Sequence, residues 1–298
     1  MIRVEAPAKL NLYLHVTGRR ADGYHELDSL VTFTALVDTL EIVPADALSL
    51  TVSGPCAEAL GTGDNLATRA AAALAERLGR RACVRIALLK RIPVAAGLGG
   101  GSADAAAVLR GLARLWGLGA AHVSDFQDVA LGLGADVPVC LDSRAAYMAG
   151  IGETLSAPPP LPACGVLLVN PGVPVPTGAI FAARQGPFSA ANRFRETPSD
   201  ASALTALLRS RRNDLEPPAR AQLPEIGRVL DWLGAMPGCL LARMSGSGAT
   251  CFGLFADEAT ATQAARAIAR ENPDWWVHAT QLVHGGETAG VSDALGGS

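Results

Sequence analysis

A glycine-rich segment at residues 93–107 carries the clearest chemical signal in this 298-residue sequence. It reads P-V-A-A-G-L-G-G-G-S-A-D-A-A-A. Because glycine lacks a Cβ, such a backbone can adopt positive φ and bring its N–H groups close to a ligand. We expect Ser102 to be the N-cap of a helix that continues to Trp116. Helix N-termini bind anions, so the segment predicts a phosphate-binding loop. The alternative is a turn that only lets a helix pack closely on a sheet.

Three charged side chains outside this segment could act on a bound phosphate. Among the 25 Lys and Arg residues only Lys9 and Lys90 are lysines, and a compact ammonium suits phosphate. Lys9 shares one face of an alternating, half-buried strand at 9–17 with Asn11, which predicts that both face one pocket. Asp136 lies in a G-A-D-V-P turn. There it is either a general base or the acceptor of an ordinary Asx turn.

Composition excludes several other classes of function. The net charge of −3 gives no general attraction for nucleic acid or anionic membranes. No apolar run approaches the roughly 20 residues that span a membrane, and the first twelve residues have no signal-peptide core, so we expect a cytoplasmic protein. The six cysteines form no C-x-x-C and the five histidines no H-E-x-x-H. We therefore expect reduced thiols, no metal held by protein side chains alone, and a small-molecule substrate.

The first half of the chain predicts a sheet with covering helices. Strands are expected at 9–17, 27–33, 39–43, 48–52, 83–89, 145–149 and 153–155. Helices are expected from Asp64 or Asn65 to Leu78, from the glycine loop to Trp116, and at 124–133. The proline-rich run at 158–162 fits neither a helix nor a central strand and is the predicted linker. It divides the chain into an N-terminal domain at 1–157 and a C-terminal domain at 158–284.

The second half predicts a smaller α/β unit. Strands are expected at 165–170, 239–243, 251–255 and 275–283, and helices at 177–184, 200–209, 224–233 and 258–270. The late order of strand, loop, strand, helix and strand is typical of a split β-α-β sandwich. We expect a mobile polar stretch at 186–199 and a flexible tail at 285–298.

Two other nucleotide-binding loops compete with the phosphate loop inferred above. A Walker loop needs a Gly-Lys dipeptide, but Lys9 follows Ala8 and Lys90 follows Leu89, so this loop is excluded. A Rossmann fingerprint needs a short turn after its strand and a final Gly or Ala. Here the connector from Leu89 is long, and Ser102 occupies the last position. A dinucleotide-dependent oxidoreductase is therefore the less favoured alternative.

The loop resembles the signature P-x-x-x-G-L-G-[GS]-S-[AS] of the galactokinase, homoserine kinase, mevalonate kinase and phosphomevalonate kinase superfamily, with one extra glycine. Two segments resemble this superfamily's first and third motifs, A-P-A-K-L-N-L at 6–12 and M-S-G-S-G-A at 244–249. Ala95 and Ala96 stand where relatives often carry glycine, which predicts a stiffer loop entry. The resemblance implies an α+β fold of two domains: a ribosomal-protein-S5-like N-terminal domain and a ferredoxin-like C-terminal α/β sandwich, with a cleft between them.

Further segments resemble one branch of that superfamily. They read R-R-A-D-G-Y-H-E-L at 19–27, P-G-V-P-V-P-T at 171–177 and N-D-L-E-P at 213–217. Members of this branch use ATP to phosphorylate the 2-hydroxyl of a methylerythritol that carries a diphosphocytidyl group, in isoprenoid precursor synthesis. The resemblance therefore implies ATP and Mg²⁺ as cofactors and a monomer or homodimer. Kinases of the homoserine or mevalonate type, and a catalytically silent binding protein, are the remaining alternatives.

The same resemblance assigns roles to individual residues. It implies Asp136 as catalytic base, with Lys9 stabilising that carboxylate, lowering the pKa of the substrate hydroxyl or neutralising the transferred phosphate. Tyr24 and His25 would recognise a cytosine ring, one by stacking and one through its ring nitrogens, and Phe181 would supply a second aromatic ring.

The remaining predicted site residues fall into three groups. Substrate binding is also implied for Asn11 and Thr177. ATP binding is implied for Asn65, Lys90, Pro93, Gly97, Leu98, Gly99, Gly100, Gly101, Ser102 and Ala103. A position near the phosphates is implied for Ser245, Gly246, Ser247 and Gly248. Ser102 would contact a phosphate or Mg²⁺.

Overall fold

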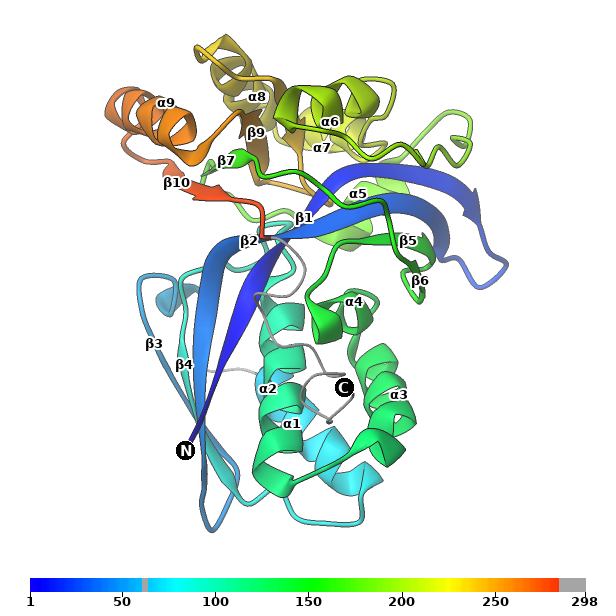
Figure 1. The fold of residues 1–298 in the computed structure, drawn as a ribbon, viewed down its shortest axis with the longest axis vertical. Coiled ribbons are helices and arrows are strands. Elements are labelled where there is room, and N and C mark those ends of the chain that lie inside the picture. The colour runs from blue at the N-terminus through cyan, green and yellow to red at the C-terminus, as the bar shows by residue number, and fades with distance from the viewer. Residues whose placement is uncertain (61–63, 284–298) are drawn as a thin grey trace.

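Two long antiparallel strands, β1 (Ile2–Arg19) and β2 (His25–Pro44), run through both halves of the molecule (Figure 1). The computed structural model describes residues 1–60 and 64–283. The predicted tail at 285–298, and residue 284 at the end of the predicted second domain, lie outside the described residues. None of the helices within those two ranges is long and apolar enough to cross a membrane.

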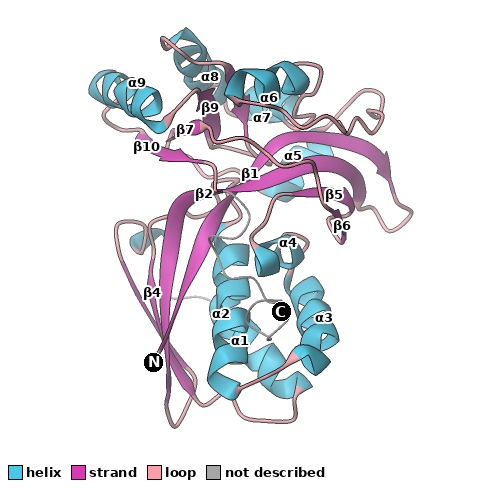
Figure 2. Ribbon diagram, in the orientation of Figure 1, coloured by secondary structure: helices cyan, strands magenta, loops and turns pink. Residues whose placement is uncertain are grey.

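The first sheet has six strands in the order β3-β4-β2-β5-β6, with β1 paired to β2. Only the β3–β4 pair is parallel. The other strands are β3 (Ser49–Ser53), β4 (Val84–Leu89), β5 (Ala146–Gly150) and β6 (Thr154–Ser156). The helices of this half are η1 (Glu58–Leu60), α1 (Leu66–Arg77), α2 (Gly100–Trp116), η2 (Ala120–His122), α3 (Val123–Leu133) and α4 (Val137–Asp142). Helix α2 packs against β1 and β2 (Figure 2).

The second sheet is antiparallel, with the order β10-β7-β9-β8. Its strands are β7 (Gly165–Asn170), β8 (Leu241–Met244), β9 (Cys251–Phe255) and β10 (Trp276–Gln281). The helices are α5 (Thr177–Ala183), α6 (Ala201–Leu208), α7 (Glu216–Gln222), α8 (Glu225–Ala235) and α9 (Glu258–Glu271). With the first sheet and its helices, this arrangement confirms the expected α+β class.

The second sheet is buried on both faces. Side chains alternate along a strand, and in β7 Val166 and Leu168 pack with Leu10 and Leu12 of β1. Leu167 of the same strand packs with the apolar side chains of α8 and α9 instead. Strand β1 therefore lies against the inner face of the second sheet and belongs to both halves of the molecule.

Strand β1 is not half-buried, as its alternation predicts, because both of its faces are covered. The polar side chains Lys9, Asn11, Tyr13 and His15 are as buried as the leucines between them. Register shifts at three places along the β1–β2 pair also interrupt the alternation. The polar side chains of this strand are thus enclosed by other parts of the protein.

Three further expectations differ from the structure. Strand β2 is one continuous strand rather than the two expected at 27–33 and 39–43. Helices α4 and α7, of six and seven residues, were not predicted, because they are too short to show a helical period and both begin with proline in the first turn. The stretch at 186–199 has no helix or strand, but it is anchored by buried Phe194 and by Arg193, whose Nε donates to Asp28 Oδ1 at 2.7 Å.

The close approach of α2 to the sheet depends on Gly111. A Cβ at this position would lie 2.5 Å from Ile42 Cδ1 and 3.1 Å from Val4 Cγ2, both on strands beneath the helix. Ile42 is fully buried, so it has no free space in which to move. A glycine inside a helix is normally unfavourable, and here it allows the helix to pack.

We expect Gly111→Ala to lower the free energy of unfolding by about 1–3 kcal/mol through overpacking, despite the better helix propensity of alanine. Gly234→Ala in α8 is the matched control, because its Cβ would meet nothing within 4 Å. That change should be neutral or stabilising by up to about 1 kcal/mol. Urea unfolding of both variants measures the difference. Equal stability of the two variants would contradict the packing argument.

Candidate active site

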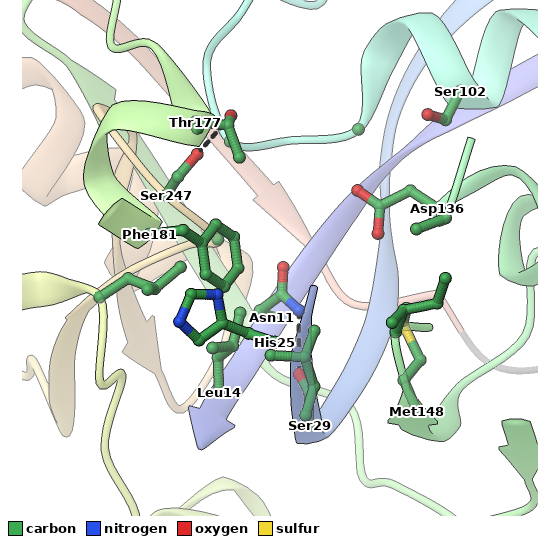
Figure 3. A pocket seen from close by; sticks show the side chains of 18 of the residues that line it. Asn11, Leu14, His25, Ser29, Ser102, Asp136, Met148, Thr177, Phe181 and Ser247 are labelled. Atoms are coloured by element: carbon green, nitrogen blue, oxygen red, sulfur yellow. Dashed lines mark hydrogen bonds between the residues drawn. The ribbon is translucent and has the colours of Figure 1, made fainter. Parts of the chain in front are cut away.

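A cleft of about 890 Å³ opens between the two halves of the molecule. Its walls come from β1, β2 and β5, the loop before α2, the start of α4, helix α5 and the second glycine loop at 244–249. Figure 3 shows Ser102 and Asp136 toward one end of the cleft and His25 and Phe181 toward the other. The cleft therefore has a phosphate-loop end and an aromatic end.

The first glycine loop ends in Gly99, which is the N-cap of α2 with φ of 61° and makes no side-chain cap hydrogen bond. Ser102 is therefore not the N-cap that its position predicts. It lies in the first helical turn, because Gly100 and Gly101 are already helical. The left-handed conformation of Gly99 makes the loop turn into the helix three residues earlier. The N-terminal turn of α2 then lines the cleft with glycine backbone.

The second glycine loop supports the first from behind. Ser245 Oγ donates to Gly97 O at 2.9 Å and accepts the N–H of Asn11 at 3.2 Å. A Cβ on Gly97 would lie 2.4 Å from Ser245 O, so this contact requires glycine. Ala95 has φ of 52°, in the left-handed region, where glycine would be unstrained. The two loops form one layer under the phosphate-loop end of the cleft.

Lys9 and Asp136 form an ion pair at this end. The distance between Lys9 Nζ and Asp136 Oδ1 is 2.8 Å, and the side chains are 4% and 37% exposed. Strand β1 holds Lys9 beside the loop, where its backbone N–H donates to Leu98 O at 2.9 Å. Asp136 is the residue before α4 but does not cap that helix with its side chain. Its carboxylate is therefore free to face the cleft, with the ammonium on one side.

The aromatic end is formed by β2 and α5. The rings of His25 and Phe181 stack with centroids 5.2 Å apart (Figure 3), and Tyr24 is 62% exposed at the rim. Burial and the positive charges of Arg19 and Arg184 lower the pKa of His25. The ring is thus neutral at pH 7, with one nitrogen donating and the other accepting.

Asn11 lies between the two ends of the cleft, and the pair Thr177 and Ser247 lies beside Phe181 (Figure 3). Asn11 Nδ2 donates to Ser29 Oγ at 2.9 Å, while Asn11 Oδ1 is buried and has no hydrogen-bond partner among the residues that the structure describes. Thr177 Oγ1 and Ser247 Oγ are 2.8 Å apart and join α5 to the second glycine loop (Figure 3). Leaving a buried acceptor without a donor costs free energy. The Asn11 amide oxygen is therefore suited to accept a hydrogen bond from a ligand.

The cleft unites most of the predicted site residues. Those lining it are Lys9, Asn11, Tyr24, His25, Gly97, Gly99, Gly100, Gly101, Ser102, Asp136, Thr177, Phe181, Gly246 and Ser247. Those that do not line it are Asn65, Lys90, Pro93, Leu98, Ala103, Ser245 and Gly248. Asn65 instead caps α1, where its Oδ1 accepts the N–H of Ala67 at 2.8 Å. Leu98 and Ala103 are buried in the core.

Lys90 does not face the cleft, contrary to expectation. Its side chain is 1% exposed, and its Nζ lies 2.5 Å from Asp38 Oδ2 and 2.6 Å from Asp104 Oδ2. Burial alone would lower the pKa of Lys90, but the two carboxylates raise it above its ordinary value. Asp38 Oδ1 also accepts the N–H groups of Arg91 and Ile92. The lysine therefore fastens the connector before the loop to α2 instead of facing a ligand.

Sequence reasoning did not find the two carboxylates of this cluster or several walls of the cleft. Asp38 and Asp104 stand in the apolar contexts L-V-D-T-L and S-A-D-A-A, and an isolated charge in such a run signals a buried ion pair. Burial raises the pKa of Asp104 to about 7, against the opposing effect of Lys90. Nothing in the sequence indicated that Leu66 and Met148 line the cleft, because each is an ordinary apolar residue of its helix or strand.

Two family models and a full-length relative match this chain. The family models "GHMP kinases N terminal domain" and "GHMP kinases C terminal" match residues 65–144 and 194–274. The chain is 55% identical to a 4-diphosphocytidyl-2-C-methyl-D-erythritol kinase of Rhodospirillum rubrum over 97% of this chain and 95% of that protein.

Solved structures have the same fold. A crystal structure of a 4-(cytidine 5'-diphospho)-2C-methyl-D-erythritol kinase is 38% identical, with a TM-score of 0.76 over 95% of this chain and 100% of that one. A homoserine kinase from Cytophaga hutchinsonii has a TM-score of 0.72 at 17% identity over 95% and 94% of the two chains. The second likeness concerns the fold alone.

We expect Lys90→Met to lower the free energy of unfolding by about 3–5 kcal/mol, because it leaves two buried carboxylates without their cation. Lys9→Met should cost about 1 kcal/mol or less, since its partner Asp136 is partly hydrated. Urea unfolding measures both variants. Adding Asp104→Leu to Lys90→Met removes one carboxylate and should recover part of the loss. A stable Lys90→Met protein would contradict this account of the cluster.

Proposed function

This chain belongs to the GHMP kinases, and within them to the 4-diphosphocytidyl-2-C-methyl-D-erythritol kinase family; from that premise we propose how its cleft works. The enzyme transfers the γ-phosphate of ATP to the 2-hydroxyl of 4-diphosphocytidyl-2-C-methyl-D-erythritol, a phosphotransfer to an alcohol. The observation that carries the proposal is the Lys9–Asp136 ion pair, 2.8 Å long, in the same cleft as the glycine loop and the His25–Phe181 stack.

Two domains meeting at the cleft suit this reaction. We place their division at the predicted linker, since the first sheet ends at Ser156 and the second begins at Gly165. ATP is bound from the side of the first glycine loop, whose backbone N–H groups hold the triphosphate. The acceptor is bound from the side of β2 and α5. The hydroxyl and the γ-phosphate then meet beside Asp136.

The transfer is an in-line displacement at the γ-phosphorus. The acceptor oxygen forms the new O–P bond, the bond to the β,γ-bridging oxygen breaks, and ADP leaves. Asp136 receives the proton of the acceptor hydroxyl through its cleft-facing carboxylate. Lys9 holds that carboxylate in place and neutralises charge on the transferred phosphoryl group.

The aromatic end selects the acceptor. Cytosine stacks against the exposed ring of Tyr24 and the ring of Phe181, while the neutral His25 ring offers one donor and one acceptor to the base edge. Asn11 Oδ1, which has no partner in the cleft, accepts from a hydroxyl of the methylerythritol. Homoserine and mevalonate have no ring for this end, which disfavours them as substrates.

Mg²⁺ fits the phosphate-loop end without a dedicated protein cage. In residues 1–60 and 64–283 no group of three or more His, Cys, Asp or Glu side chains could hold a metal. The cleft offers the Asp136 carboxylate and the Ser102 hydroxyl, and Mg²⁺ commonly takes one or two protein ligands together with phosphate oxygens and water. When bound, it would neutralise charge on the phosphates.

We expect ADP release in a coupled assay to require the diphosphocytidyl substrate. Mevalonate and homoserine at the same concentration should give no release above the background without acceptor. Release with mevalonate or homoserine, and none with the diphosphocytidyl substrate, would contradict the proposed acceptor. Turnover of NAD(P)H without ATP consumption would contradict the kinase reaction itself.

Asp136→Asn should lower kcat by about 10²-fold or more, because the amide cannot accept the hydroxyl proton. Its KM for ATP should stay near that of the parent, since the glycine loop is unchanged. Asp142→Asn is the matched control: this aspartate lies at the other end of α4, is exposed, and is not part of the cleft. An unchanged kcat in folded Asp136→Asn protein would remove this residue from the mechanism.

A further inference from the structure

Arg110 is the largest fully buried side chain of the described residues, at 1% exposed. It projects from the middle of α2, and no carboxylate in residues 1–60 and 64–283 forms an ion pair with it. Burial lowers the pKa of its guanidinium to about 10, so it is still charged at neutral pH. Burying a cation without a carboxylate in contact costs free energy. Apolar packing alone would not require an arginine at this position.

The guanidinium is satisfied by backbone carbonyls from two other elements. Nη1 donates to Cys140 O at 2.6 Å and to Leu141 O at 3.2 Å, both at the end of α4. Nη2 donates to Glu5 O at 2.6 Å, on strand β1. The last carbonyls of a helix have no partner within that helix. Arg110 therefore supplies the partners that end α4 and ties them to β1.

Ser143 completes this helix end. It terminates α4 in the left-handed conformation, with φ of 50°, and its Oγ donates to Cys140 O at 2.9 Å. Arg110 Nη1 lies 3.4 Å from the same Oγ. A non-glycine residue in this conformation needs support from its surroundings. Arg110 and Ser143 together fix where α4 stops.

The three elements joined by Arg110 are those that carry the reacting groups. Glu5 is four residues before Lys9 on β1, and Cys140 is four residues after Asp136, about 6 Å along the helix axis. Arg110 itself is on the helix that begins at the glycine loop. A helix of six residues is not stable by itself. The position of Asp136 at one end of α4 thus depends on what holds the other end.

We propose that Arg110 is a positioning residue that sets Asp136 against Lys9 by holding the end of α4 and strand β1 to α2. This role rests on the proposed function of Asp136 and deepens it. Arg110 does not line the cleft, so it acts through α4 and β1. Sequence reasoning had no signal for it beyond an arginine between apolar residues of the helix, in A-V-L-R-G-L.

The expected kinetic effect is on the transfer step and not on ATP binding. A displacement of about 1 Å at the reacting groups can cost 10²-fold in rate. Arg110→Met, which removes every donor, should lower kcat about 10- to 100-fold with the KM for ATP near that of the parent. Arg110→Lys keeps the charge but not the forked guanidinium that reaches both Glu5 and Cys140. Its kcat should therefore lie between that of the parent and that of Arg110→Met.

Arg243→Lys is the matched control for loss of a buried guanidinium. Arg243 is 6% exposed, and it donates to the carbonyls of Leu12, Leu208 and Arg211. None of these contacts is on α4. This variant should lose stability as Arg110→Lys does, while its kcat, measured well below the unfolding temperature, should fall much less.

Two measurements separate positioning from general destabilisation. Because Arg110 acts through Asp136, adding Arg110→Met to Asp136→Asn should lower kcat much less than it does in the parent. Hydrogen exchange of the amides at 137–143 should be faster in Arg110→Met than in the parent, and unchanged in Arg243→Lys. Full multiplicative loss in the double variant, or unchanged exchange at 137–143, would overturn the proposal.

The exchange measurement needs no substrate. It therefore tests the positioning role of Arg110 separately from the proposed acceptor. If the parent phosphorylates a different alcohol, the proposed acceptor fails, and the kcat comparison is made with that alcohol. If exchange at 137–143 rises but kcat of folded Arg110→Met protein equals that of the parent, α4 is held by Arg110 without any effect on transfer, and the positioning role is wrong.

Discussion

The burial of strand β1 on both of its faces is the constraint on which the site depends. Val4 and Ala6 near the start of the strand pack with helix α2, and Leu10 and Leu12 farther along it pack with the inner face of the second sheet. Polar side chains on such a strand cannot reach bulk solvent, so each must find a partner within the protein or in a cavity. Lys9 forms an ion pair with Asp136, and the Asn11 amide nitrogen donates to Ser29. The Asn11 amide oxygen has no partner among the described residues. The polar groups of β1 that a ligand can reach, Lys9 and Asn11, line the cleft between the two halves.

Buried charge in this protein serves mainly to hold backbone in place. Lys90 joins the connector before the glycine loop to α2 through two carboxylates, and Arg110 joins α2 to β1 and α4 through carbonyls. Ionic contacts of this kind often stabilise no more than well-packed apolar residues would. The advantage of the guanidinium is direction, because its planar fork of donors fits few arrangements of acceptors. A site that transfers a phosphoryl group gains more from such fixed geometry than from added stability.

Local signals predicted the parts of the fold that local interactions determine. The bounds of β7 and β9 follow from short-range patterns, as does the cap of α1 at one of the two residues expected, Asn65. The alternation of β1 predicted a half-buried strand whose polar face looks into a pocket, and Lys9 and Asn11 do line the cleft. The strand is buried on both faces because the covering sheet comes from residues more than 150 positions later. The sequence likewise did not indicate that Lys90 points away from the cleft, because its partner Asp38 lies on another strand, β2. Alternating and charged residues indicate a need for partners, but not which partners the tertiary structure supplies.

The groups proposed for catalysis and those proposed for recognition are separated along the same pair of strands. Lys9 and the glycine loops lie on one side of Asn11, while His25 and Phe181 lie at the aromatic end, where β2 begins. The hydrogen bond between Thr177 and Ser247 links α5, which carries Phe181, to the loop that supports the phosphate loop. Binding of a ring at the aromatic end is thus mechanically connected to the phosphate-loop end. Binding energy from a part of the substrate that does not react can therefore serve to place the hydroxyl beside Asp136.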